Sequence, residues 1–222
     1  MVSRMREVAD QLDATLIDMR FVKPLDRDTI LQAASTHDLI CTIEDGVAAG
    51  GAGSAVLEIL SQLGIQVPAL VMGIEDRFIP QGSIEELMRV NHLDAQSVMR
   101  RINEALLIES LVDLKPYNTM AVSAKARYFA RVRNEQELRF ALDFASREQV
   151  DPFILGAGSN LLITSEFVNR LVIHMEMKGF EVNEQARTIK VGAGENWHRT
   201  VERILALGWG GVENLAMIPG TM

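Results

Sequence analysis

Short apolar runs alternate with segments of helical periodicity throughout the first half of the chain. Residues 14–19, 38–44 and 67–72 have the composition of buried strands. The intervening segments place apolar residues at helical spacing, and the predicted helices are residues 1–12, 26–34, 54–63, 83–90 and 95–108. Strands and helices that alternate at such short intervals predict βα units on a mainly parallel sheet, and therefore an α/β fold.

The second half has strands and helices in a less regular order. Asn134, with Glu137 three residues later, is a typical helix start, and the predicted helix extends to about Arg147. A second helix begins at Glu195 or Asn196 and ends near Leu207. The predicted strands are residues 126–132 and 171–174, with a hairpin made of residues 180–182 and 188–191.

A glycine-rich stretch in this half is the clearest candidate for a binding site. Residues 153–155 form an apolar strand that enters Gly156-Ala157-Gly158-Ser159-Asn160, and another apolar run follows at once from Leu161. Successive N–H groups in a turn of small residues suit an anion, above all a pyrophosphate. The stretch is neither a Walker loop nor a Rossmann fingerprint. A tight strand–turn–strand corner without a ligand is an equal alternative on the pattern alone.

Composition excludes several classes of function. The net charge is −8, and no basic cluster interleaved with aromatic residues is present, so the sequence predicts no nucleic-acid partner. Cys41 is the single cysteine, which excludes an intrachain disulfide and favours a reducing, cytoplasmic setting. No apolar run has the length of a bilayer span, so no membrane partner is expected. His37 and His92 have no further ligand at a suitable spacing, so no metal site is predicted.

Four motifs in the first half carry a resemblance to a known family. They are residues 19–26 (Met-Arg-Phe-Val-Lys-Pro-Leu-Asp), residues 42–46 (Thr-Ile-Glu-Asp-Gly), residues 50–54 (Gly-Gly-Ala-Gly-Ser), and residues 73–79 with Gly82. In this order they resemble the C-terminal, transketolase-like domain of 1-deoxy-D-xylulose-5-phosphate synthase, over about residues 1–105. The resemblance implies a three-layer α/β/α domain.

The same resemblance bears on ligands and partners. The family's thiamine diphosphate, Mg²⁺ and activating glutamate belong to two other domains, so this cofactor is expected only if those domains are supplied. Arg20 matches an arginine that helps to hold the substrate phosphate, a task suited to a guanidinium fork. A surface ion pair at a strand end is the alternative for Arg20, and it is favoured in this chain. Such domains commonly dimerise, which makes a homodimer through residues 1–110 the alternative, non-catalytic function.

The second half resembles another family. Residues 114–119, 154–162, 191–198 and 211–220 are similar, in order, to the N-terminal part of UDP-N-acetylenolpyruvoylglucosamine reductase. The resemblance implies an α+β FAD-binding domain of the vanillyl-alcohol-oxidase type over residues 111–222. It also implies the family's chemistry, in which NADPH reduces an enolpyruvyl sugar nucleotide through FAD to make the peptidoglycan precursor UDP-N-acetylmuramate.

The resemblance also assigns cofactor-binding residues. The FAD contacts it implies are Gly156, Ala157, Gly158, Ser159, Asn160 and Leu161 around the pyrophosphate, and Ile218, Pro219, Gly220 and Thr221 beside the flavin. Residues 192–194 are a weaker candidate, for which a strand-to-helix turn is the favoured reading, and His198 is expected to be a packing or capping group.

The chain as a whole is expected to join parts of two biosynthetic enzymes. The two parts meet near residues 109–114, which we call the seam. Either the preceding helix runs on through the seam as a stiff connector, or two genes were joined within it. The family's catalytic serine, glutamate and arginine follow the matched segment, so the FAD-binding domain is expected to be truncated. No catalytic residue is therefore assigned, and either weak FAD binding or none is expected, without turnover.

Overall fold

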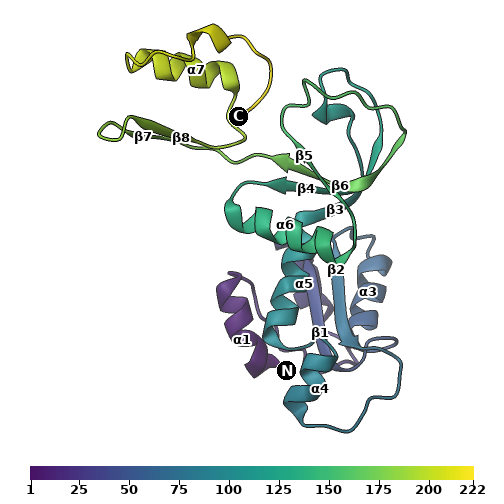
Figure 1. The fold of residues 1–222 in the computed structure, drawn as a ribbon. Helices are drawn as coiled ribbons and strands as arrows, with labels where there is room; N and C mark the ends of the chain where they lie inside the picture. Colours follow the sequence, from purple (N-terminus) through teal and green to yellow (C-terminus); the bar gives the residue numbers. More distant parts are fainter. The chain divides into compact units, whose positions relative to one another are not determined.

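The computed structural model describes residues 1–222, which divide into two compact units, Met1–Leu106 and Leu107–Met222 (Figure 1). The division falls four residues before the boundary expected at residue 110. Residues Ile108–Asp113 form a strand, β3, of the second unit, and α5 (Ala95–Leu107) enters it without a linker. The helix predicted over residues 95–108 ends at Leu107 and does not run on through the seam, and the strand that follows was not predicted.

The first unit is a parallel two-stranded sheet between helices. Strand β1 (Ile40–Val47) pairs with β2 (Ala69–Ile74), in register from Ile40 opposite Ala69 to Ile43 opposite Met72. The helices are α1 (Val2–Gln11), α2 (Arg27–Thr36), α3 (Ala52–Gln62), α4 (Ile84–Val90) and α5. Their arrangement around β1 and β2 is visible in Figure 1.

Two apolar clusters make this unit a three-layer α/β/α domain, as expected. Met72 packs with Met5 and Val8 of α1 and with Val98 of α5. The second cluster joins α2 to α3 and consists of Ile30, Val56, Ile59 and Leu60, with Ile40 packed against it. Burial of these side chains provides most of the driving force for the unit.

The predicted buried strand at residues 14–19 is wrong. These residues form no strand, and Leu16 and Ile17 are 39% and 43% exposed. No backbone hydrogen bond joins them to β1, and the main-chain bond at Ala14 is donated back to Ala9 of α1. An apolar, β-branched composition makes a strand only where a neighbouring strand edge lies within hydrogen-bonding distance, because β-propensity depends on context.

The second unit contains a four-stranded mixed sheet in the order β3-β4-β6-β5. Strand β4 (Lys125–Val132) is antiparallel to β3 and parallel to β6 (Phe167–Met175), which is parallel to β5 (Pro152–Leu155). Helix α6 (Glu135–Arg147) covers one face, where Ala141 and Ala145 pack on Ile173. The other face carries Phe129, Val172 and Leu155.

The remaining elements of the second unit are short. A hairpin consists of β7 (Phe180–Asn183) and β8 (Thr188–Val191), close to its predicted bounds, and α7 (Trp197–Ala206) follows it. Two 3-10 turns, η1 (Lys115–Tyr117) and η2 (Glu213–Leu215), complete the unit. Helix α7 begins after Asn196, whose side chain accepts a hydrogen bond from Arg199 N.

Candidate functional site

The glycine-rich loop, residues 156–160, lies at the carboxyl end of β5. No strand follows it directly, because residues 161–165 are irregular and β6 begins only at Phe167. The alternative of a tight strand–turn–strand corner is therefore wrong. Ala157 and Asn160 are exposed, whereas Gly158 is buried.

Steric contacts explain two of the loop's small residues. Gly158 has φ +65°, and a Cβ there would overlap the carbonyl oxygen of Tyr117 and lie 2.7 Å from the Cα of Asn118. A Cβ on Gly156 would overlap the hydroxyl of Thr221. Only glycine allows the loop to approach both neighbouring segments this closely.

The loop offers a series of free donors. None of the backbone N–H groups from Ala157 to Leu161 donates a hydrogen bond within the chain, and the Ser159 and Asn160 side chains also have no partner in it. Around the loop, Ile154 and Leu162 are exposed apolar side chains. Consecutive unpaired N–H groups beside apolar surface suit a ligand that carries both phosphate and a flat apolar ring.

The structure brings the two predicted cofactor-binding segments together. Thr221 is in contact range of Gly156, and it forms an isolated antiparallel bridge with Asn196. Gly220 O accepts a hydrogen bond from Trp197 N (3.1 Å), and Met222 N donates one to Glu195 O (3.0 Å). Ile218 and Pro219 stay exposed. The start of α7 thus holds residues 218–221 beside the glycine-rich loop.

Residues 192–194 make close backbone contacts of their own. Cβ atoms on Gly192 and Gly194 would overlap or crowd the backbone of residues 175–178, and Lys178 Nζ donates to Gly194 O. Glu195 accepts from Gly179 N at 3.0 Å. His198 Nδ1 accepts the N–H of Met217 at 3.3 Å, which makes it a capping group for the segment that precedes Ile218.

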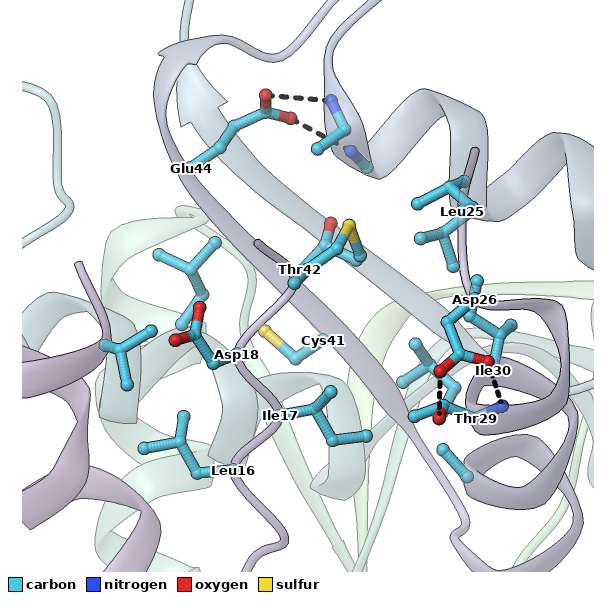
Figure 2. Close-up of a pocket in the computed structure, with 18 of the residues that line it drawn as sticks. Leu16, Ile17, Asp18, Leu25, Asp26, Thr29, Ile30, Cys41, Thr42 and Glu44 are labelled. Carbon is cyan, nitrogen blue, oxygen red and sulfur yellow. Dashed lines mark hydrogen bonds between the residues drawn. The ribbon is translucent and has the colours of Figure 1, made fainter. Parts of the chain in front are cut away.

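A second candidate site is a cavity of about 780 Å³ in the first unit. It lies between the irregular segment 14–20, α2 and β1, and Figure 2 shows Asp18, Cys41, Thr42 and Glu44 around it. Burial raises the pKa of the Cys41 thiol to about 12, although the charge of Arg101 opposes the shift. No group of three or more His, Cys, Asp or Glu side chains is arranged to hold a metal ion.

Arg20 lies at this cavity, but its guanidinium is paired. Nε is 3.1 Å from Asp18 Oδ2, and the side chain is 78% exposed. Glu44 is also engaged, because its carboxylate accepts the N–H groups of Ala52 (2.9 Å) and Gly53 (3.1 Å) at the start of α3. Neither the Arg20 guanidinium nor the start of α3 is therefore free to receive a phosphate at this cavity.

Sequence reasoning missed a polar group next to the glycine-rich loop. Arg131 Nη2 donates to the Tyr117 hydroxyl at 2.9 Å, and Arg131 Nη1 is 3.0 Å from Glu109 Oε1. The bond to Tyr117 is the main reason that the pKa of Arg131 rises above its usual range. These residues lie on three successive elements, β3, η1 and β4, and only the pairing of the two strands and the turn between them brings the side chains together, so no local motif could have connected them.

Two family models match the chain, and they match different halves. Residues 1–98 match the transketolase C-terminal domain, and residues 126–222 match the FAD binding domain. The two halves of the chain thus match a transketolase C-terminal domain and an FAD binding domain, in the order expected from the sequence. The helices of the structure include none long and apolar enough to cross a membrane.

Three relatives of the first unit are named 1-deoxy-D-xylulose-5-phosphate synthase. The protein from Nitrosococcus oceani is 50% identical over 96 residues, which cover 43% of this chain and 15% of that protein. Those from Cupriavidus metallidurans and Shewanella putrefaciens are 49% and 48% identical, and the matches cover 43% and 44% of this chain and 15% and 16% of theirs. The chain thus spans about 15% of the length of these relatives.

Two solved structures are also similar to parts of the chain. UDP-N-acetylenolpyruvylglucosamine reductase from Thermus caldophilus is 30% identical with a TM-score of 0.37, covering 50% of this chain and 38% of that one. A split-gene transketolase, described as an inactive beta4 tetramer, is 30% identical with a TM-score of 0.42. The match covers 47% of this chain and 35% of that one. The fold class rests on the two family models.

Proposed function

We propose that the second unit binds FAD, with its pyrophosphate on the N–H groups of residues 157–161 and its ring system beside residues 218–221. The observation that carries this proposal is the run of unpaired backbone donors in a loop whose glycines permit close approach. The match of residues 126–222 to the FAD binding domain supports it. When bound, FAD would supply hydride-transfer chemistry, and the chain's own residues would hold and orient it.

We further propose that the chain derives from the cell-wall reductase and from the deoxyxylulose phosphate synthase, and that these 222 residues bind flavin without turnover. Reduction of an enolpyruvyl group requires a positioned acid. Residues 157–161 and 218–221 offer hydroxyl, amide and apolar groups, but no carboxylic acid and no imidazole. Use of NADPH and a role in peptidoglycan synthesis are those of the reductase from which the second unit would derive, and a cytoplasmic location is part of the proposal for this chain. Thiamine diphosphate would bind only with the synthase's other domains present.

The test is a titration of the purified chain with FAD, followed by flavin fluorescence. Wild type should bind, and Gly156→Ala should weaken binding at least tenfold, because the new Cβ separates the loop from Thr221. Gly210→Ala is the matched control, since a Cβ there lies 3.8 Å or more from its neighbours. Wild-type protein that leaves FAD fluorescence unchanged at any concentration would refute FAD binding, and reduction of enolpyruvyl-UDP-N-acetylglucosamine by NADPH would refute the absence of turnover.

A non-catalytic homodimer built on the first unit is the second candidate function. Large apolar side chains are exposed on this unit, among them Phe21, Phe78 and Ile84. Exposed apolar surface of this kind is often an interaction site. A colourless protein that sediments as a stable dimer would favour this function over the first.

A further inference from the structure

The glycine-rich loop rests on the turn formed by residues 117–119. The carbonyl of Tyr117 and the Cα of Asn118 leave no room for a Cβ at Gly158. Thr119 donates to Gly158 O from its backbone N (3.3 Å) and from its hydroxyl (3.4 Å). The position of this turn therefore determines the position of the loop's central residue.

The turn itself is fixed from two directions. Asn118 is buried, and its amide donates to Leu114 O (2.7 Å) and Val122 O (2.9 Å) while its Oδ1 accepts from Val122 N (3.0 Å). These bonds hold the turn internally. A buried amide is stable only when it is hydrogen-bonded in this way. Both partners of Asn118 lie outside the strands, so these bonds close the turn without linking it to the sheet.

Tyr117 links the turn to the sheet. Its ring lies 4.6 Å from that of Phe129 and 5.1 Å from that of His174, centroid to centroid. Its hydroxyl accepts from Arg131 of β4, which is in turn paired with Glu109 of β3. A hydrogen bond from a charged donor is stronger than a neutral one, and the guanidinium fork can serve both partners at once.

We propose that Arg131 is a positioning residue for the FAD site: held by Glu109, it fixes Tyr117 and so sets the geometry of the loop at Gly158. Arg131 acts through Tyr117 and the turn, without a contact to the ligand. Glu109 and Tyr117 lie outside both segments that match family models, so the residues between the two matches are part of the site. The inference rests on the proposed FAD binding.

Affinity measurements on the full chain test this. Arg131→Met and Tyr117→Phe should each raise the FAD Kd about tenfold, equivalent to about 1.4 kcal/mol. The double variant should lose no more FAD affinity than either single variant, because both substitutions break the same hydrogen bond between Arg131 and Tyr117. Affinity for riboflavin, which lacks the pyrophosphate, should stay within twofold of wild type. Loss of riboflavin affinity in parallel would indicate general destabilisation and overturn the proposal.

Arg127→Met is the matched control. Arg127 lies on the same strand, and its guanidinium bonds Asn169 and stacks on Tyr128 with no link to the turn. The FAD Kd of this variant should stay within twofold of wild type. An equal loss in both arginine variants would contradict a specific role for Arg131.

Amide exchange without FAD separates this inference from the proposed function. Arg131→Met should speed exchange at the Thr119 amide about tenfold, while Ile173 in β6 stays protected and Arg127→Met has no effect at Thr119. This result supports the positioning role even if wild type binds no FAD, in which case only the proposed function fails. Unchanged exchange at Thr119 overturns the inference whatever the FAD titration shows.

Discussion

At the scale of single residues, the tetrapeptide Gly-Ala-Gly-Ser occurs twice and serves two purposes. At residues 51–54 its donors are occupied by the Glu44 carboxylate, and Cβ atoms on Gly51 and Gly53 would overlap Glu44 and Thr42. At residues 156–159 no internal carboxylate is present, and the donors are free. The first copy is therefore a packed helix start, whereas the second can receive an external anion.

Replacing Glu44 should destabilise the first unit. Glu44→Ala removes the acceptor for two N–H groups of α3, and we expect the free energy of unfolding to fall by about 1–2 kcal/mol. Urea unfolding measures the change. Asp45→Ala is the control, because this neighbouring side chain is exposed, and its effect should be below about 0.5 kcal/mol. Equal effects at the two positions would show that the contact to α3 contributes little.

Cys41 should be unreactive in the folded protein at pH 8. Its pKa is raised by burial from 9.0 to about 12, so the thiolate is scarce until the chain unfolds. Because the folded pKa exceeds the unfolded one, the contribution of this thiol to stability is full below pH 9 and is lost as the pH rises towards 12. Labelling by a disulfide reagent with and without urea measures this, and rapid labelling without urea would contradict it.

At the scale of elements, the helix caps follow the sequence closely, whereas two segments depart from the strand prediction. Asn134 Oδ1 accepts from Glu137 N at 2.9 Å, as the local motif predicts. In contrast, β3 was not predicted and residues 14–19 form no strand. A cap depends on residues three positions apart, whereas a strand depends on a partner that is distant in the sequence.

Removing the Asn134 cap should cost about 1 kcal/mol in the stability of the second unit. Asn134→Ala loses the side-chain acceptor, whereas Asn134→Asp keeps one at the same position. Chemical denaturation should therefore show a loss for the alanine variant and near wild-type stability for the aspartate variant. Similar losses in both variants would mean that the amide, and not the capping oxygen, matters.

At the scale of the whole molecule, two units with separate cores follow one another along the chain. Each unit matches a different family, and each contains its own candidate site. Units with separate cores can unfold separately, and a ligand stabilises only the unit that binds it.

We therefore expect two thermal transitions, of which FAD raises only one. At a free FAD concentration of about 100 times Kd, the second unit should gain about 2.7 kcal/mol. Scanning calorimetry with and without FAD measures the shift, and Gly156→Ala, with its weakened FAD binding, should show a smaller one. A single transition that moves as a whole would contradict independent units.

The sequence by itself determined the fold class of both halves, the helices with their caps, and the two segments that meet at the glycine-rich loop. These depend on local periodicity and on motifs, which the chain carries wherever it folds. Only the tertiary structure decided that one Gly-Ala-Gly-Ser is filled by Glu44 and the other is open, and that Arg131 supports Tyr117 beside Gly158. The physical reason is that a backbone N–H group is free or occupied according to which side chain from another element packs against it. The identity of that side chain is fixed only when the strands are paired in register.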